Sequence, residues 1–108
     1  MILIVGGFAA GKRAWARDNL GYRDSDFSRD PQDGAPVLYD LQDLEQADWE
    51  DLLKKEVVIC NEVGCGLVPV DPAERERRER TGRLCIELAK RADRVIRVVC
   101  GVGTAIKG

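Results

Sequence analysis

The chain opens with the stretch M-I-L-I-V-G-G-F-A-A-G-K-R at residues 1–13, and this stretch decides the fold. A short apolar run ends at Gly6, four residues follow, and Gly11 and Lys12 lead into a segment compatible with a helix. A strand, a glycine loop and a helix start in this order form G-x-x-x-x-G-K, in which main-chain N–H groups surround a phosphate. The helix N-terminus adds partial positive charge, and the lysine supplies a mobile charge for the terminal phosphates.

This loop departs from the usual pattern at one position. Arg13 stands where a serine or threonine usually follows the lysine and binds Mg²⁺. A guanidinium there can instead pair with a phosphate and replace part of the charge of the ion. The alternative interpretation is a glycine-rich turn between strand and helix that binds no ligand. The predicted nucleotide-binding residues are Gly6, Gly7, Phe8, Ala9, Ala10, Gly11, Lys12 and Arg13.

Length and charge limit the classes of protein to which the chain can belong. A chain of 108 residues is expected to form one domain, here a P-loop nucleotide-binding domain over residues 1–108. The formal net charge of -2 gives no basic footprint, so we expect no nucleic-acid partner. Residues 1–5 are apolar, have no basic leader and are too few to span a membrane, which favours a core strand over a signal peptide. We therefore expect a cytoplasmic protein without a membrane partner.

The cysteines and the missing histidine restrict the chemistry. The four cysteines are Cys60, Cys65, Cys85 and Cys100, and none forms a C-x-x-C pair. Cys60 and Cys100 lie in apolar runs and are predicted to be buried thiols, with an all-cysteine metal site as the alternative. Because the chain contains no histidine, it cannot use histidine as a general base or as a covalent phosphoryl carrier.

Apolar strands alternate with helical segments along the chain, which predicts an α/β fold. We expect a small RecA-like P-loop domain with a mostly parallel sheet of four or five strands and helices on its faces. Asp71 followed by Pro72 is typical of an N-cap and a first helical residue. The expected strands span 2–5, 37–39, 56–60 and 94–100; the expected helical segments span 12–20, 41–53 (broken) and 72–92; a loop is expected over 22–35 and a short tail over 101–107.

Several polar or glycine-rich segments follow the expected strands. Ligands of such folds bind beyond the carboxyl ends of the strands, where residues 6–13, Asp40 and residues 61–66 all fall. Asp40 is therefore a candidate to act with Lys12 in catalysis and to hold Mg²⁺, and the alternative is a turn aspartate. In the stretch 61–69, polar and glycine residues either face a ligand or form a plain turn. The residues of this predicted substrate loop are Asn61, Glu62, Gly64 and Gly66.

The second half of the chain resembles a known family. The stretch N-E-V-G-C-G-L-V-P at residues 61–69, the spacing from it to Arg75, Arg78 and Gly82, and the ending over 89–107 carry the resemblance. They are similar to the adenosylcobinamide kinase / adenosylcobinamide-phosphate guanylyltransferase family, whose members have N-E-V-G-x-G-[IL]-V-P followed by a helix with R-x-x-x-R-D-x-x-G. The family's phosphate loop, G-G-x-x-x-G-K-S, is similar to residues 6–13.

The resemblance implies a nucleotide-binding protein of cobalamin biosynthesis or salvage. It implies phosphoryl transfer from ATP or GTP to adenosylcobinamide, with Arg78 on the substrate side, Mg²⁺ as a cofactor and assembly as a homo-oligomer. Family members are longer, and here the middle is abridged and lacks the histidine that accepts GMP, so guanylyl transfer is not expected. Because Arg13 replaces the family's serine, a member that binds nucleotide or corrinoid without chemistry, as a sensor or partner subunit, is the alternative.

Overall fold

The computed structural model describes residues 1–62 and 71–108, in which six strands form one sheet in the order β2-β3-β4-β1-β5-β6. All neighbouring strands pair in parallel except β5 and β6, which are antiparallel. Two short 3₁₀ turns lie at Asp24–Asp26 and Leu41–Asp43. The elements are β1 (Ile2–Gly6), α1 (Lys12–Leu20), β2 (Phe27–Ser28), β3 (Val37–Leu38), α2 (Trp49–Leu52), β4 (Val57–Asn61), α3 (Pro72–Arg91), β5 (Arg94–Val99) and β6 (Val102–Lys107).

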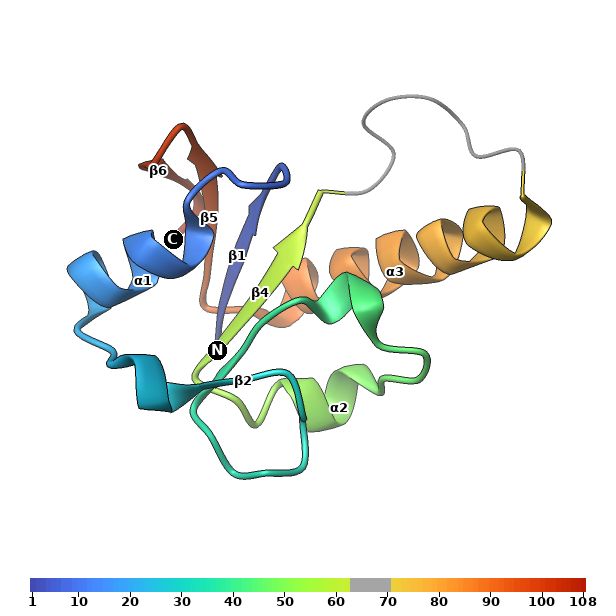
Figure 1. The fold of residues 1–108 in the computed structure, drawn as a ribbon, viewed down its shortest axis with the longest axis horizontal. Coiled ribbons are helices and arrows are strands. Elements are labelled where there is room, and N and C mark those ends of the chain that lie inside the picture. The colour runs from blue at the N-terminus through green and yellow to red at the C-terminus, as the bar shows by residue number, and fades with distance from the viewer. Residues whose placement is uncertain (63–70) are drawn as a thin grey trace.

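The sheet is covered on both faces, so the molecule has three layers. Successive side chains of a strand point to opposite faces, and β1 accordingly sends Leu3 to one cluster and Ile4 to the other. Helix α1 covers the Ile4 face with Ala16, whereas α3 covers the Leu3 face with Leu88 (Figure 1). This arrangement confirms the predicted α/β class with a mostly parallel sheet.

Local signals place both long helices where the sequence predicts them. Helix α1 begins after Gly11 and ends before Gly21, whose φ of 78° lets its amide donate to Arg17 O at 3.2 Å. Helix α3 begins at Pro72, and the Asp71 carboxylate accepts a hydrogen bond from the Ala73 amide at 3.0 Å. The broken segment predicted over 41–53 is a 3₁₀ turn followed by the four-residue helix α2.

Both edges of the sheet differ from the sequence-based expectation. The expected loop over 22–35 contains β2, whose two residues are too few to give a periodic pattern. The expected tail over 101–107 is β6, so the sheet has more strands than predicted and β5 is not the last strand. The prediction extended β5 through Cys100, but Cys100 and Gly101 have φ values of 50° and 77° and form the two-residue turn of a hairpin.

The turn also accounts for the cysteines. Cys100 is exposed, which corrects the prediction that it is buried, because it sits at the tip of the β5–β6 hairpin. Cys60 is buried in the core as predicted, with its sulfur 3.5 Å from that of Cys85, and Cys65 lies outside the described residues. Within residues 1–62 and 71–108 no three His, Cys, Asp or Glu side chains are grouped as metal ligands would be. No helix in these same ranges is long and apolar enough to cross a lipid bilayer.

Candidate nucleotide-binding site

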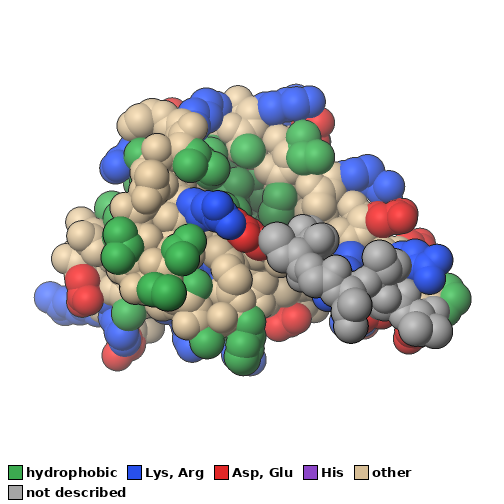
Figure 2. Space-filling model, turned by 90° about the horizontal axis from the view of Figure 1, so that it is seen from above, with side chains coloured by type: hydrophobic (Ala, Val, Ile, Leu, Met, Phe, Trp, Pro, Cys, Tyr) green, Lys and Arg blue, Asp and Glu red, His purple; other side chains and the backbone are tan. Residues whose placement is uncertain are grey.

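A cavity of about 890 Å³ opens beside the loop between β1 and α1, at the carboxyl ends of the parallel strands. Figure 2 views the molecule onto these ends and shows basic, acidic and apolar side chains gathered around the centre. A cavity of this size lies in the range that holds nucleotide-sized ligands. One wall is formed by residues 8–14, the other by residues from 24–29 and 39–43, and Ile59 and Asn61 complete the lining.

Two residues of the loop 6–13 have left-handed backbone conformations. Ala9 and Gly11 have φ values of 57° and 88°, and residues with positive φ between right-handed ones form anion-binding concavities. The Ala10 amide donates to Gly7 O at 3.2 Å. No side chain in the described ranges accepts a hydrogen bond from an amide of residues 8–13. Apart from the Ala10 amide, these donors therefore have no side-chain acceptor among the described residues and could face an external anion.

The loop rests against the far edge of the sheet. The Gly101 amide, in the hairpin turn, donates to Ala10 O at 2.8 Å. A Cβ at Gly6 would lie 2.5 Å from Val98 O on β5, a distance that real Cβ atoms do not adopt. The first glycine of the motif is thus required for close packing of β1 against β5, while a Cβ at Gly7 would meet nothing within 4 Å.

Lys12 lies in the first turn of α1 and is largely buried, with 8% of its surface exposed. Its Nζ donates to Gly7 O at 2.7 Å, so the ammonium group folds back over the loop. Desolvation lowers the pKa of Lys12 below its ordinary value, and the nearby Asp40 and Glu62 carboxylates partly offset the effect. A bound phosphate would replace the single carbonyl acceptor by several anionic oxygens.

The opposite wall is built around Asp40, which directly follows β3 and Tyr39. Asp40 has a left-handed φ of 55°, and its Oδ2 lies 3.1 Å from Arg29 Nη2. Gln42 donates from Nε2 to Asp40 Oδ1 at 3.3 Å. The guanidinium groups of Arg13 and Arg29 both stack on the Tyr39 ring, at 4.8 and 5.1 Å from its centroid.

The surroundings of Asp40 in this structure differ from those of a typical Mg²⁺ ligand. Mg²⁺ requires oxygen ligands in near-octahedral geometry, but both carboxylate oxygens of Asp40 already face N–H donors. Arg13 supplies a cation where the usual motif supplies a hydroxyl ligand. The donor set around Asp40 therefore suits cationic side chains, and the role of Asp40 in holding a metal stays a prediction.

The other predicted site residues are distributed over several places. Asn61 lines the cavity, and its amide donates to Gln42 Oε1 at 2.9 Å. Glu62 pairs with Arg97 of β5 at 2.6 Å, and its amide donates to Gly6 O at 2.8 Å. Arg78 is half-buried on α3 and does not line the cavity. Gly64 and Gly66 lie outside the described residues.

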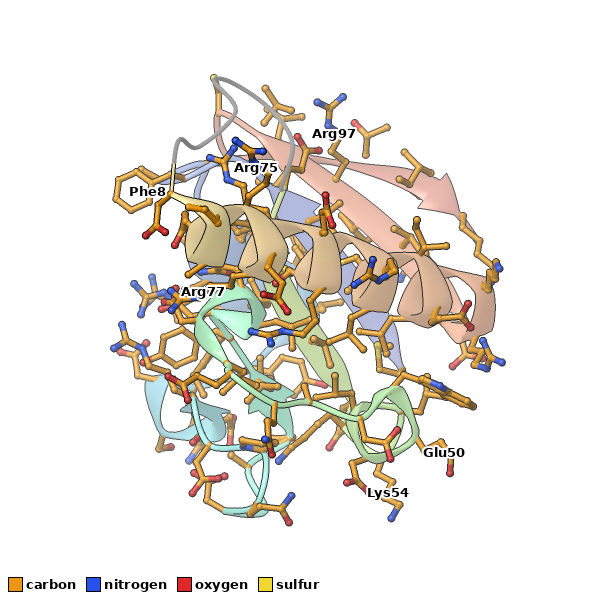
Figure 3. The ribbon with its side chains drawn as sticks, turned by 90° about the vertical axis from the view of Figure 1, so that its right-hand side faces the viewer. Phe8, Glu50, Lys54, Arg75, Arg77 and Arg97 are labelled. Atoms are coloured by element: carbon orange, nitrogen blue, oxygen red, sulfur yellow. The ribbon has the colours of Figure 1, made fainter. Side chains whose placement is uncertain are left out.

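Phe8, at the tip of the loop, is 90% exposed and projects away from the body of the protein (Figure 3). Of the predicted site residues, the structure brings Gly11, Lys12, Arg13, Asp40 and Asn61 together around one cavity.

Sequence reasoning missed several residues that line the cavity, and three of them make the main contacts of the opposite wall. Arg29, Tyr39 and Gln42 all line the cavity, and the first of them follows the unpredicted strand β2. Their contribution depends on mutual contacts between side chains that no spacing rule encodes. The only signal was the position of Tyr39 and Gln42 beside Asp40 at the end of a predicted strand.

Comparison with known proteins adds the family. A sequence model described as Cobinamide kinase / cobinamide phosphate guanyltransferase matches residues 32–106. The bifunctional adenosylcobalamin biosynthesis protein CobU of Salmonella typhimurium (strain LT2) is 45% identical over 53 residues, which are 49% of this chain and 29% of that protein. The protein of the same name from Escherichia coli (strain K12) is 36% identical over 85 residues, covering 69% of this chain and 47% of that protein.

The matched proteins and the matched range determine how far the comparison extends over this chain. The chain spans less than half the length of these curated relatives. The family match begins at residue 32, after the loop 6–13, and does not include that loop. The match covers more than half of the chain and includes one wall of the cavity, from Tyr39 to Gln42. The chain therefore belongs to the cobinamide kinase / cobinamide phosphate guanyltransferase family of cobalamin biosynthesis.

Proposed function

We propose that this chain binds the triphosphate of ATP or GTP in the cavity between α1 and β3. The observation that carries the proposal is the loop 6–13, in which the amides of residues 8–13 donate to no side chain among the described residues and lie beside the Lys12 side chain. Main-chain donors, a helix N-terminus and a lysine together form a site for phosphate. The residues assigned to the nucleotide are those of the loop, with Lys12 on the terminal phosphates.

The family supports a reaction that consumes this nucleotide. The relatives are named as bifunctional adenosylcobalamin biosynthesis proteins, and the family as cobinamide kinases and guanyltransferases. In the proposed reaction a cobinamide hydroxyl oxygen attacks the γ-phosphorus, the bond to the β,γ-bridging oxygen breaks, and the nucleoside diphosphate leaves. The hydroxyl proton passes to solvent or to a nearby carboxylate. Such transfer depends mainly on positioning and on stabilisation of phosphate charge. Guanylyl transfer through a histidine is not proposed, because the chain has none.

A second candidate function is nucleotide or corrinoid binding without phosphoryl transfer, as a sensor or partner subunit. The observation in its favour is the Asp40 environment, where Arg29 and Gln42 hold both carboxylate oxygens. The replacement of the usual hydroxyl by Arg13 points in the same direction. This candidate shares the nucleotide site and differs only in the absence of turnover.

Assembly as a homo-oligomer also remains a prediction. Strand β6 is one of the two edges of the described sheet, and the β5–β6 hairpin carries the large exposed hydrophobic residues Val99, Val102 and Ile106. Free strand edges and exposed apolar side chains favour contact with another chain. Sedimentation equilibrium would show a concentration-dependent mass above that of one chain if the prediction holds.

Calorimetric titration of ATP and GTP, each with Mg²⁺ and with EDTA, tests the nucleotide site. Lys12→Ala is expected to weaken binding at least about tenfold, because it removes the charge nearest the terminal phosphates. Lys54→Ala is the matched control, since Lys54 lies outside the cavity with 80% of its side chain exposed. Failure of both nucleotides to bind, or equal binding by Lys12→Ala, would reject the proposal.

Turnover separates the two candidates. Incubation with labelled ATP or GTP and adenosylcobinamide should yield a phosphorylated corrinoid if the chain is a kinase. Tight nucleotide binding without this product supports the binding function instead. Arg13→Ser tests the missing hydroxyl: it should introduce or increase dependence on Mg²⁺ if that side chain limits the reaction.

A further inference from the structure

We propose that Arg29 is a polyphosphate-binding residue of this cavity and that it exchanges Asp40 for the polyphosphate when the ligand enters. The inference rests on the proposed nucleotide site and specifies how that site neutralises charge. Arg29 belongs to no part of the glycine-loop motif, and it directly follows β2 on the opposite wall.

The first step of the argument is position. Arg29 and Arg13 stack on the same Tyr39 ring, at 5.1 and 4.8 Å from its centroid, although they come from segments 16 positions apart. Both line the cavity that Lys12 also lines. The ring fixes the planes of the two guanidinium groups and leaves their edges to donate hydrogen bonds. The two guanidinium groups are thus held close together beside the loop 6–13.

The second step is the charge that now holds Arg29. Its partner is Asp40, at 3.1 Å, and the two side chains are 68% and 29% exposed. Ion pairs with this exposure contribute little to stability and exchange readily. A polyphosphate offers several anionic oxygens and accepts two parallel N–H bonds from one guanidinium, so it competes well with a single carboxylate. In the free protein, Asp40 therefore acts as an internal counterion for a ligand-binding arginine.

The third step is the fit to the altered motif. Asp40 is surrounded by N–H donors, and Arg13 stands at the position of the usual metal-binding hydroxyl. Positive charge for the phosphates is supplied in this chain by Lys12, Arg13 and Arg29, which all line the cavity. Another cavity arginine, Arg17, lies on α1, on the same side of the cavity as the loop. Arg29 is consequently the cation on the opposite wall that can close the phosphate site.

The competing interpretation is structural: the Arg29–Asp40 pair only ties the segment after β2 to the end of β3. The two interpretations differ in sign for one variant. If Arg29 must leave Asp40 to bind phosphate, Asp40→Asn removes a competitor and strengthens metal-free polyphosphate binding. If the pair is structural, Asp40→Asn weakens binding or leaves it unchanged.

The experiment titrates inorganic tripolyphosphate and ATP, both in EDTA, into the wild type and five variants. We expect Arg29→Ala to weaken the binding of both ligands about tenfold and Arg29→Lys to restore part of the lost affinity. We expect Asp40→Asn to strengthen tripolyphosphate binding several-fold, and this gain to vanish in Arg29→Ala/Asp40→Asn. Arg83→Ala, an exposed charge-matched change on α3, should behave as the wild type. Circular dichroism and urea unfolding show whether each variant folds. If Arg29→Ala does not fold, Arg29→Gln is titrated in its place.

The outcomes separate this inference from the nucleotide proposal. If the wild type binds neither ligand, the nucleotide site itself is rejected. If the wild type binds and Arg29→Ala binds equally well, Arg29 is not a ligand residue and only this inference is overturned. Weaker tripolyphosphate binding by Asp40→Asn, with Arg29 present, overturns the proposed exchange.

Discussion

The two walls of the cavity are held in place by different parts of the chain. The loop 6–13 is positioned mainly by its main chain. Ala9 and Gly11 have positive φ, and Ala10 O accepts a hydrogen bond from the Gly101 amide. The opposite wall lies on the segment 22–43, which is held largely by side chains. Tyr22 donates to Glu56, Arg29 pairs with Asp40, and Gln42 accepts from the Asn61 amide. A wall set by the backbone tolerates few substitutions at its glycines, whereas a wall set by side chains can be altered one contact at a time.

The largest effect should come from a methyl group at the base of the loop. Gly6→Ala places a Cβ 2.5 Å from Val98 O, and backbone atoms there can move apart only by shifting β1 from β5. We expect a loss of about 3 kcal/mol in the free energy of unfolding, typical of forced overpacking. Gly7→Ala is the matched control, since its Cβ would meet nothing within 4 Å and should cost less than about 0.5 kcal/mol.

Urea unfolding of the two variants beside the wild type measures this difference. Equal stability of Gly6→Ala and Gly7→Ala would contradict the view that main-chain packing fixes the loop. A selective loss at Gly6 would also explain why a glycine is needed there independently of any ligand.

The backbone-determined wall is the part that the sequence predicts well. Glycine at positions 6 and 11, a preceding apolar strand and a following helix define the turn locally, and α1 begins and ends at the predicted residues. Asp71 and Pro72 likewise define the start of α3 without help from distant residues. These features depend on φ angles and caps, which individual residue types encode. The family resemblance could also be predicted from the sequence, because a contiguous motif carries it, and the match over residues 32–106 confirms it.

The side-chain wall was predicted only in outline. Asp40 was placed correctly at the end of β3, but its pairing with Arg29 depends on β2, a two-residue strand inside an expected loop. The β5–β6 hairpin was missed because its two-residue turn contains cysteine as well as glycine, a weak turn signal. Such contacts join residues far apart in the sequence through tertiary packing, and no single-sequence pattern specifies them.

The next effect concerns the charge of Lys12 on the backbone-determined wall. Burial lowers the pKa of Lys12 from 10.5, so its ammonium deprotonates at a lower pH than that of an exposed lysine. Polyphosphate binds the charged form better, so affinity should fall as pH rises through the lowered pKa of the free protein. Above that pKa the expected decrease approaches tenfold per pH unit, until the pKa of the bound form is reached.

Calorimetric titration of tripolyphosphate between pH 8 and 10.5 would show this decrease. Lys12→Arg provides the control, because a guanidinium keeps its charge over the whole range and its affinity should stay nearly flat. If the wild type and Lys12→Arg change in parallel, groups other than Lys12 cause the pH dependence, and the lysine does not face the ligand.

On the side-chain wall, removal of Gln42 should have a smaller effect. Gln42 accepts from the Asn61 amide at 2.9 Å and donates to Asp40 at 3.3 Å, so it links β4 to the end of β3. Gln42→Ala leaves the amide without this acceptor, which should cost about 1 kcal/mol of stability. Gln46→Ala, an exposed glutamine in the same connection, is the control and should be neutral. Thermal or urea unfolding of both variants decides the point, and an equal response would show that Gln42 is not a structural link.

The smallest effect tests the outer part of the same wall and depends on pH. The Tyr22 hydroxyl donates to Glu56 at 3.0 Å, and burial together with this bond raises the pKa of Tyr22 from 10.0 to about 12. A folded-state pKa above the unfolded value stabilises the fold below pH 10, and this contribution is lost as the pH rises from 10 toward 12. Tyr22→Phe should therefore cost about 0.5–1 kcal/mol in the free energy of unfolding near neutral pH, and this difference from the wild type should shrink between pH 10 and 12.

Urea unfolding at pH 8, 9.5 and 11 measures how this stability difference changes with pH. In the Glu56→Gln background, Tyr22→Phe should show a weaker pH dependence. A difference that stays constant up to pH 11 would mean that the hydroxyl does not hold this wall, and that the aromatic packing of Tyr22 on Phe27, with ring centroids 6.4 Å apart, is sufficient.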